Sequence, residues 1–144
     1  MYLKTVTSKL WKFYTQCSVD GSSDLYNFFL GLGQRHVKDV EGLVAKLEKI
    51  SEHHLGPRIL NQEICHTIDD KNKIFQIRHG KIRLLCFYSH AEQKVIICAA
   101  AFIKGTQKTP KNEIEKAKTI KDEYATAVAA GQVFIVPEPD EDEA

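Results

Sequence analysis

The stretch KIFQIRHGKIRLLCFYS, residues 73–89, decides the fold, because two runs of alternating apolar and polar residues meet there at one glycine. Glycine at the first central position is typical of a two-residue type II′ hairpin turn, which places the turn at Gly80 and Lys81. This register predicts four cross-strand pairs: Arg78 with Arg83, Ile77 with Leu84, Gln76 with Leu85 and Phe75 with Cys86.

The two arginines are the unusual feature of this hairpin. Like charges directly opposite each other on one face of a sheet destabilise it by roughly 0.2–1 kcal/mol. Unless Arg78 and Arg83 each have a carboxylate partner, the arrangement favours an anion between them. The other face is apolar, which predicts that helices cover it; it carries Phe75, Ile77, Ile82, Leu84, Cys86 and Tyr88.

Three segments upstream of the hairpin have clear patterns. Residues 9–15 alternate as a strand rich in aromatic residues. Ser22, Ser23 or Asp24 is placed to cap a helix whose apolar residues have helical spacing: Leu25, Phe28, Phe29 and Leu32. Residues 37–50 form a second amphipathic helix with one apolar stripe.

Downstream of the hairpin, residues 95–103 (VIICAAAFI) are apolar on both faces, which predicts a central third strand. Two registers against the hairpin are open. A loop of two or four residues places Phe102 and Lys104 on the arginine face, whereas a three-residue loop places Cys86 opposite Cys98. We favour the first register because it brings the basic side chains together.

The last helix is expected to begin at Pro110 with Thr109 as its N-cap, and residues 133–136 are expected to add a short edge strand. The order of the elements predicts an α+β fold. An antiparallel sheet, made of an N-terminal strand and a three-strand meander, is packed on one face by a helical hairpin and followed by a C-terminal helix.

The charges are divided unevenly along the chain. The net charge is +1, but five acidic residues lie in residues 138–144, so residues 1–137 carry 20 basic and 14 acidic groups, a net charge of +6. Residues 73–121 alone carry +8. We therefore predict one basic domain over residues 1–136 and an acidic, disordered tail over residues 137–144. A basic, partly aromatic surface is typical of proteins that bind a phosphodiester chain, and a merely solvated lysine-rich surface is the alternative.

Other classes of protein are disfavoured by what the sequence lacks. No apolar run approaches the roughly 20 residues needed to cross a bilayer, and no apolar secretory leader stands at the start. The four cysteines have no C-x-x-C spacing, and the histidines are scattered. We expect a soluble cytoplasmic protein with reduced cysteines, no metal and no cofactor.

The run from residue 74 to residue 124 resembles the RelE/ParE superfamily of type II toxins, in particular its HigB-like, phage-derived branch. Members of that branch have a strand ending in arginine, a second strand that begins with arginine, an apolar strand ending in Phe-x-Lys-Lys, and a Thr-Pro-x-x-Glu start to the closing helix. The corresponding residues here are IFQIRHGKIRLLCFYS and VIICAAAFIKGTQKTPKNEIEKAKTIKDEY. Gly105 departs from the pattern, because the branch usually repeats lysine there.

The resemblance implies a RelE-like fold and a small toxin that is paired with a helix-turn-helix antitoxin and cuts mRNA on the ribosome. Such an endoribonuclease is metal-independent: the ribose 2′-hydroxyl attacks the adjacent phosphate, while the protein supplies cations and proton transfer. Carried over by position, the catalytic cations are Arg78, Arg83 and Lys104. His79 and Tyr88 are candidates for proton transfer. RNA or the ribosome would be held by Lys73, Lys81, Lys108, Lys111 and Lys118.

Two non-catalytic interpretations stay open. One is a protein of the same fold that inhibits a protein target, as the gyrase-poisoning members of the superfamily do. The other is a degenerate phage protein that binds only an antitoxin-like partner.

Overall fold

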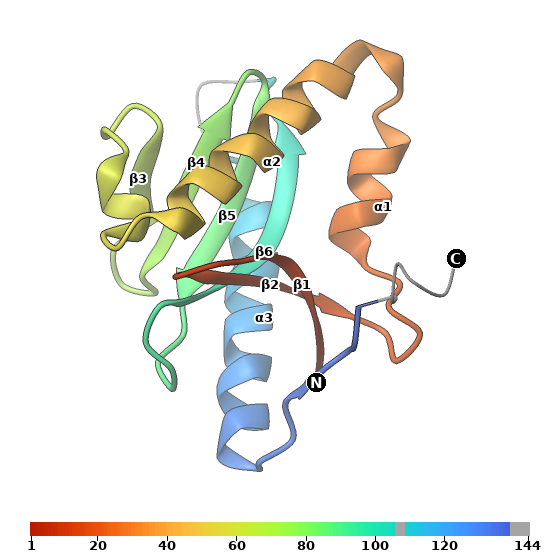
Figure 1. Cartoon of the computed structure of the whole chain (residues 1–144), viewed down its shortest axis with the longest axis vertical. Coiled ribbons are helices and arrows are strands. Elements are labelled where there is room, and N and C mark those ends of the chain that lie inside the picture. Colours follow the sequence, from red (N-terminus) through yellow and green to blue (C-terminus); the bar gives the residue numbers. More distant parts are fainter. Residues whose placement is uncertain (106–108, 139–144) are drawn as a thin grey trace.

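The computed structural model describes residues 1–105 and 109–138, which form one seven-stranded sheet with three α-helices (Figure 1). The strands are β1 (Tyr2–Ser8), β2 (Lys12–Cys17), β3 (Cys65–Asp69), β4 (Ile74–His79), β5 (Ile82–Tyr88), β6 (Val95–Ile103) and β7 (Phe134–Ile135). The helices are α1 (Asp24–Gly31), α2 (Val37–Glu52) and α3 (Lys111–Ala129), together with the short 3-10 helices η1 (Gln34–His36) and η2 (Gly56–Ile59).

The sheet is mixed, with strand order β3-β4-β5-β6-β2-β1-β7. The predicted meander of β4, β5 and β6 is antiparallel, and β6 is central as expected. The prediction of a purely antiparallel sheet was wrong, because β2 pairs with β6, and β7 with β1, in parallel. The physical reason is that α1 and α2 cross over between β2 and the meander, and crossover connections of this length allow parallel pairing. β1 and β3 were not predicted.

The register of the β4–β5 hairpin is the one that the sequence predicted: Phe75 with Cys86, Gln76 with Leu85, Ile77 with Leu84 and Arg78 with Arg83. Gly80 has φ +56°, and Lys81 has no positive φ, which fits a turn with glycine at its first central position.

The β5–β6 pairing combines the two registers that the sequence left open. Arg83 pairs with Phe102, and beyond an irregularity in the ladder Cys86 pairs with Cys98. The two neighbouring pairs, Leu85 with Ala100 and Cys86 with Cys98, leave Ala99 as the extra residue of a β-bulge. The bulge shifts the register by one residue, so each alternative holds at one end of the strand.

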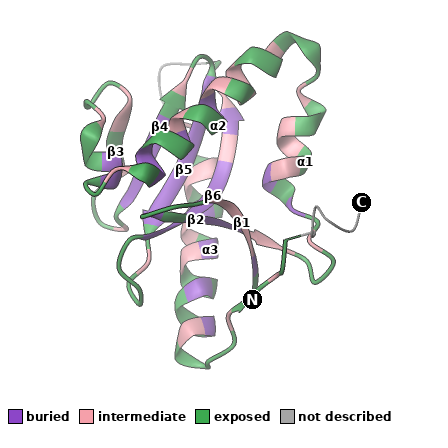
Figure 2. Cartoon of the chain, viewed as in Figure 1, coloured by how far each residue is buried: buried purple, intermediate pink, exposed green. Residues whose placement is uncertain are grey.

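Helices cover both faces of the sheet (Figures 1 and 2). Helices α1 and α2 pack on one face through Leu25, Leu43, Leu47 and Ile50. Helix α3 packs on the other face through Ala117, Ile120 and Tyr124. The prediction that helices lie on a single face was therefore wrong. Leu85, Phe87 and the apolar second face of β6 need their own cover, and α3 supplies it.

The predicted N-cap is present in α1 but not in α3. Ser23 caps α1, because its hydroxyl accepts a hydrogen bond from the Tyr26 amide at 3.2 Å. The N-cap of α3 is Pro110 rather than Thr109. The Thr109 hydroxyl instead donates to Gln76 Oε1 at 3.1 Å, which ties the start of α3 to β4.

The predicted edge strand at the end of the domain is present as β7, which pairs only with β1. Most of the predicted acidic tail, residues 139–144, lies outside the described residues. None of the helices in the described part of the chain is long and apolar enough to cross a membrane.

Candidate functional site

Arg83, at the start of β5, is buried although it is charged, with 6% of the residue exposed. Its Nη1 atom donates to the carbonyl oxygens of Gly80 at 2.8 Å and Ile82 at 3.0 Å. Within residues 1–105 and 109–138, no ion pair includes Arg83 or Arg78. Burial, and then the charge of Arg78, lower the pKa of Arg83. A buried cation without a counter-ion costs stability and favours binding of an anion.

The turn that presents Arg83 is held from the opposite side by α2. The Lys81 amide donates to Asp39 Oδ2 at 3.4 Å. A Cβ atom at Gly80 would lie 2.2 Å from Asp39 Oδ1, so this position requires glycine for space as well as for its φ of +56°. Asp39 therefore fixes the turn but leaves the arginine face free.

Four residues that the topology brings together form what we call the arginine site: Arg78, Arg83, Phe102 and Lys104. Arg78 is exposed opposite Arg83 on β4, and Phe102 is opposite Arg83 on β6. The Lys104 amide donates to the Lys81 carbonyl at 2.8 Å, so the strand pairing continues to Lys104. The three predicted catalytic cations therefore lie at one end of the sheet, which is what the favoured register required.

The predicted RNA-binding lysines divide into two groups. Lys81 is in the turn of the hairpin beside the arginine site, and Lys111 begins α3, whose entry is tied to β4 through Thr109 and Gln76. Lys73 is in the β3–β4 turn, and Lys118 pairs with Asp69 at 3.7 Å and Glu115 at 3.1 Å. Lys108 lies outside the described residues.

The two predicted proton-transfer residues do not join the arginine site. His79 lies against α2, where a Cβ atom at Gly42 would be 1.9 Å from its Nε2 atom, and burial and the charge of Lys46 lower the pKa of His79. Tyr88 is five residues from Arg83 on β5, about 17 Å in an extended strand, and on the opposite face.

Glu113 is a candidate that the sequence reasoning missed. It precedes the buried Ala117 by four residues, so it lies on the sheet-facing side of α3, one turn closer to the arginine site. Its Oε2 atom is shielded from solvent, and among residues 1–105 and 109–138 it has no hydrogen-bond partner. The i, i+4 spacing to Ala117 was visible in the sequence, but the sequence did not show which face of the sheet α3 covers.

The described ranges, residues 1–105 and 109–138, contain no cluster of side chains suited to hold a metal ion. Nowhere in them do three or more His, Cys, Asp or Glu side chains come together as a group that could hold a metal ion.

Comparison with known protein families gives a match over more than half of the chain. The model of a family described as phage derived protein Gp49-like (DUF891) matches residues 36–122, a range that contains α2, the whole meander and the start of α3. Every residue of the arginine site, and Glu113, falls inside this range. No curated protein matches the chain.

Proposed function

We propose, from the fact that this chain belongs to the phage-derived Gp49-like family, that it is the toxin of a type II toxin–antitoxin pair and cuts mRNA on the ribosome. In this proposal it belongs to the HigB-like branch of the RelE/ParE superfamily, with a RelE-like fold, and works in the cytoplasm. The single observation that carries the proposal is the buried guanidinium of Arg83, which makes no ion pair within the described residues.

The proposed reaction is attack of a ribose 2′-hydroxyl on the neighbouring phosphodiester. Negative charge builds on the phosphate oxygens in the transition state, and pre-placed cations stabilise that charge. Arg83 would contact the phosphate, with Arg78 and Lys104 beside it, and Lys81 and Lys111 would hold the flanking backbone. These interactions require no rearrangement of the hairpin, because the register and the Asp39 contact already fix it.

Glu113 is the proposed acceptor of the hydroxyl proton. A carboxylate is an acceptor when ionised, and Glu113 offers an oxygen that no other described group occupies. His79 and Tyr88 are on the opposite face of the sheet from Arg83, which disfavours a direct role for either in proton transfer.

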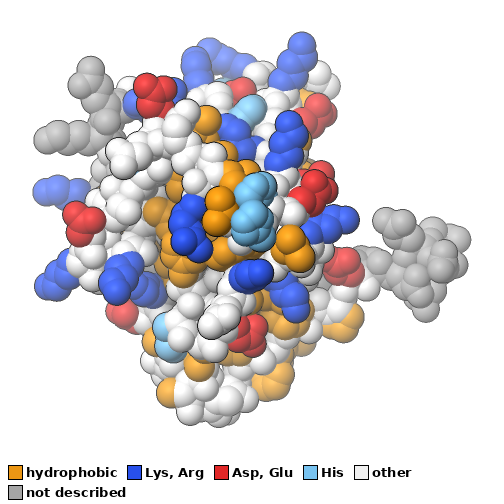
Figure 3. Space-filling model, turned by 60° about the vertical axis from the view of Figure 1, so that its left-hand side comes forward, with side chains coloured by type: hydrophobic (Ala, Val, Ile, Leu, Met, Phe, Trp, Pro, Cys, Tyr) orange, Lys and Arg blue, Asp and Glu red, His pale blue; other side chains and the backbone are white. Residues whose placement is uncertain are grey.

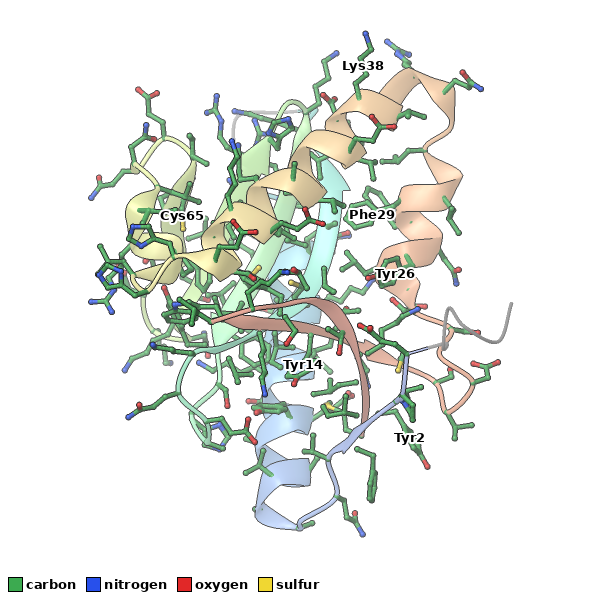
Figure 4. All side chains as sticks on the ribbon, viewed as in Figure 1. Tyr2, Tyr14, Tyr26, Phe29, Lys38 and Cys65 are labelled. Atoms are coloured by element: carbon green, nitrogen blue, oxygen red, sulfur yellow. The ribbon has the colours of Figure 1, made fainter. Side chains whose placement is uncertain are left out.

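An apolar groove between α1 and α2 supports the proposed antitoxin partner. It has a volume of about 370 Å³, and Tyr26 and Phe29 point into it from α1 (Figure 4). Leu30 and Val37 on its rim are 81% and 43% exposed. Amphipathic helices bind in grooves of this kind, and we propose that a helical segment of the helix-turn-helix antitoxin does so here.

The test is cleavage of a defined mRNA on purified translating ribosomes. Arg83→Ala is expected to lower the cleavage rate by about 100-fold or more. Lys38→Ala is the matched control, because Lys38 is an exposed cation that points away from the body of the molecule at the start of α2 (Figure 4). Leu30→Asp should weaken antitoxin binding and leave cleavage unchanged. Equal cleavage by wild type and Arg83→Ala would contradict the proposal.

A second candidate function is non-catalytic binding of a protein target or of the antitoxin alone. It is favoured by the positions of His79 and Tyr88, neither of which reaches the arginine site. Wild-type protein that arrests growth without producing cuts inside codons would support this second function and exclude the first.

A further inference from the structure

A second hollow with polar walls lies between η2 and β3, and we call it the η2 hollow. Its volume is about 600 Å³, and its lining includes Arg58, His66, Asp70, Lys73, Phe75 and Tyr88. Cys65, on β3, marks its position in Figure 4. None of the residues that line the hollow belongs to the arginine site. The side chains of Tyr88 and Arg83 project from opposite faces of β5.

The hollow contains an exposed aromatic ring that is held in place from behind. Tyr88 is 43% exposed, and its ring centroid is 4.9 Å from that of the buried Phe75 and 6.0 Å from that of Trp11. Trp11 is itself fixed, because its Nε1 donates to the His54 carbonyl at 3.2 Å. Tyr88 therefore offers a flat apolar face whose orientation is set by two neighbouring rings, Phe75 and Trp11, which lowers the entropic cost of stacking a ligand on it.

Two cationic side chains, Arg58 and Lys73, line the hollow together with the Tyr88 ring. Arg58 and Lys73 are exposed, and the described residues provide neither with an ion pair. Figure 3, which brings the β3 side forward, shows Lys, Arg and His side chains around an apolar patch on this face. Burial and the nearby Cys65 raise the pKa of Tyr88, and the charge of Arg58 opposes that rise, so Arg58 acts on the phenol electrostatically.

The combination of groups selects one class of ligand. Aromatic rings stack with nucleobases, and arginine and lysine contact the phosphates of the same strand. The carboxylate of Asp70 accepts hydrogen bonds from hydroxyl or amino groups, which a nucleotide supplies. A nucleotide carries a base, sugar hydroxyls and a phosphate, and so uses all three features of the hollow.

We propose that the η2 hollow binds a nucleotide of single-stranded RNA, with the base stacked on Tyr88 and the phosphate contacted by Arg58 and Lys73. This site goes beyond the proposed function, because binding there needs neither cleavage nor the arginine site. The same chemistry would accept a free nucleotide, so the test separates the two sources.

The experiment uses the full chain and two probes, AMP and a short fluorescein-labelled oligoadenylate. Trp11 is the single tryptophan of the chain and contacts Tyr88, so its fluorescence reports occupation of the hollow. Tyr88→Leu is expected to weaken oligoadenylate binding, measured by fluorescence anisotropy, by about tenfold or more, since it removes one stacking partner. Tyr88→Phe keeps the ring and should bind within about twofold of wild type.

Charge variants keep the test decisive if Tyr88→Leu fails to fold. Arg58→Gln should weaken binding and reduce its salt dependence, whereas Lys38→Gln, the matched control on α2, should change it far less. Quenching of Trp11 by AMP supports a site for free nucleotides as well as RNA, and quenching by oligoadenylate alone supports an RNA site. Unchanged binding by Arg58→Gln and by folded Tyr88→Leu overturns the proposal.

The arginine site provides the last control. Arg83→Ala should keep the Trp11 response even if it loses all cleavage, so the two proposals can fail separately. A Trp11 response that is lost in Arg83→Ala and kept in Tyr88→Leu would locate the nucleotide at the arginine site and overturn the inference.

Discussion

The two ends of α3 meet the same face of the sheet in different ways. At the C-terminal end, Tyr124 is buried with its ring 5.9 Å from that of Phe87, and its hydroxyl forms a hydrogen bond with Ser89 Oγ at 2.7 Å. At the N-terminal end, Glu113 has an unpartnered oxygen and Arg83 is buried without an ion pair within the described residues.

This difference indicates that the C-terminal end of α3 stabilises the fold, whereas the N-terminal end is suited to binding. A region selected only for stability satisfies its buried polar groups, as the pair of Tyr124 and Ser89 does. Uncompensated buried charge is costly and is concentrated at functional sites. The N-terminal end of α3 therefore has the physical character of a site, and four predictions test this comparison.

The largest effect is expected at the C-terminal end. Tyr124→Ala should lower the free energy of unfolding by about 3–5 kcal/mol, because it removes a large buried ring and leaves a cavity. Tyr124→Phe, which removes only the hydroxyl, should cost about 1 kcal/mol. Denaturant unfolding measures both values. A small effect of Tyr124→Ala would mean that the C-terminal end of α3 does not stabilise the fold, which would contradict the comparison between the two ends.

The second prediction concerns Glu113 at the opposite end. Glu113→Gln should lower the rate of mRNA cleavage by about 100-fold, because the amide cannot accept the hydroxyl proton. Glu115→Gln is the matched control, since Glu115 is exposed on the same helix and pairs with Lys118. Equal cleavage by both variants would exclude Glu113 as the proton acceptor.

The third prediction separates stability from binding at Arg83. Arg83→Met should change the free energy of unfolding by no more than about 1 kcal/mol, because the loss of two hydrogen bonds to carbonyls is offset by removal of a buried charge. Cleavage should nevertheless fall as it does for Arg83→Ala. A loss of stability comparable to that of Tyr124→Ala would show that Arg83 is a structural residue.

The sequence predicted the hairpin in full detail because two local signals agreed. The alternation on both sides of Gly80 fixed the faces, and the glycine fixed the turn, so Arg78 and Arg83 were paired correctly. The bulge at Ala99 could not be predicted in this way, since it falls in a run of three alanines without any polar residue to mark a face.

The position of α3, and with it Glu113, depended on tertiary packing. The apolar residues Leu85 and Phe87 on the arginine face were visible in the sequence, but the two charges beside them suggested an open surface. In the structure, α3 covers the apolar part of this face, and the entry to α3 is tied to Gln76, two residues before Arg78. Strand β3 was missed because its residues are mostly polar and none of them is fully buried, as expected for an edge strand.

The smallest predicted effect comes from adding one cation next to Lys104 of the arginine site. Gly105 follows Lys104, has no positive φ, and a Cβ atom there would meet nothing within 4 Å. Gly105→Lys should therefore leave stability unchanged within about 0.5 kcal/mol. If the new lysine contacts RNA, the slope of log affinity against log salt should become steeper by about 0.7, the value for one further phosphate contact on a single strand. Gly31→Lys is the matched control, because Gly31 is equally unobstructed but lies at the end of α1. An equal change of slope in both variants would mean that net charge, rather than a site at this end of α3, governs binding.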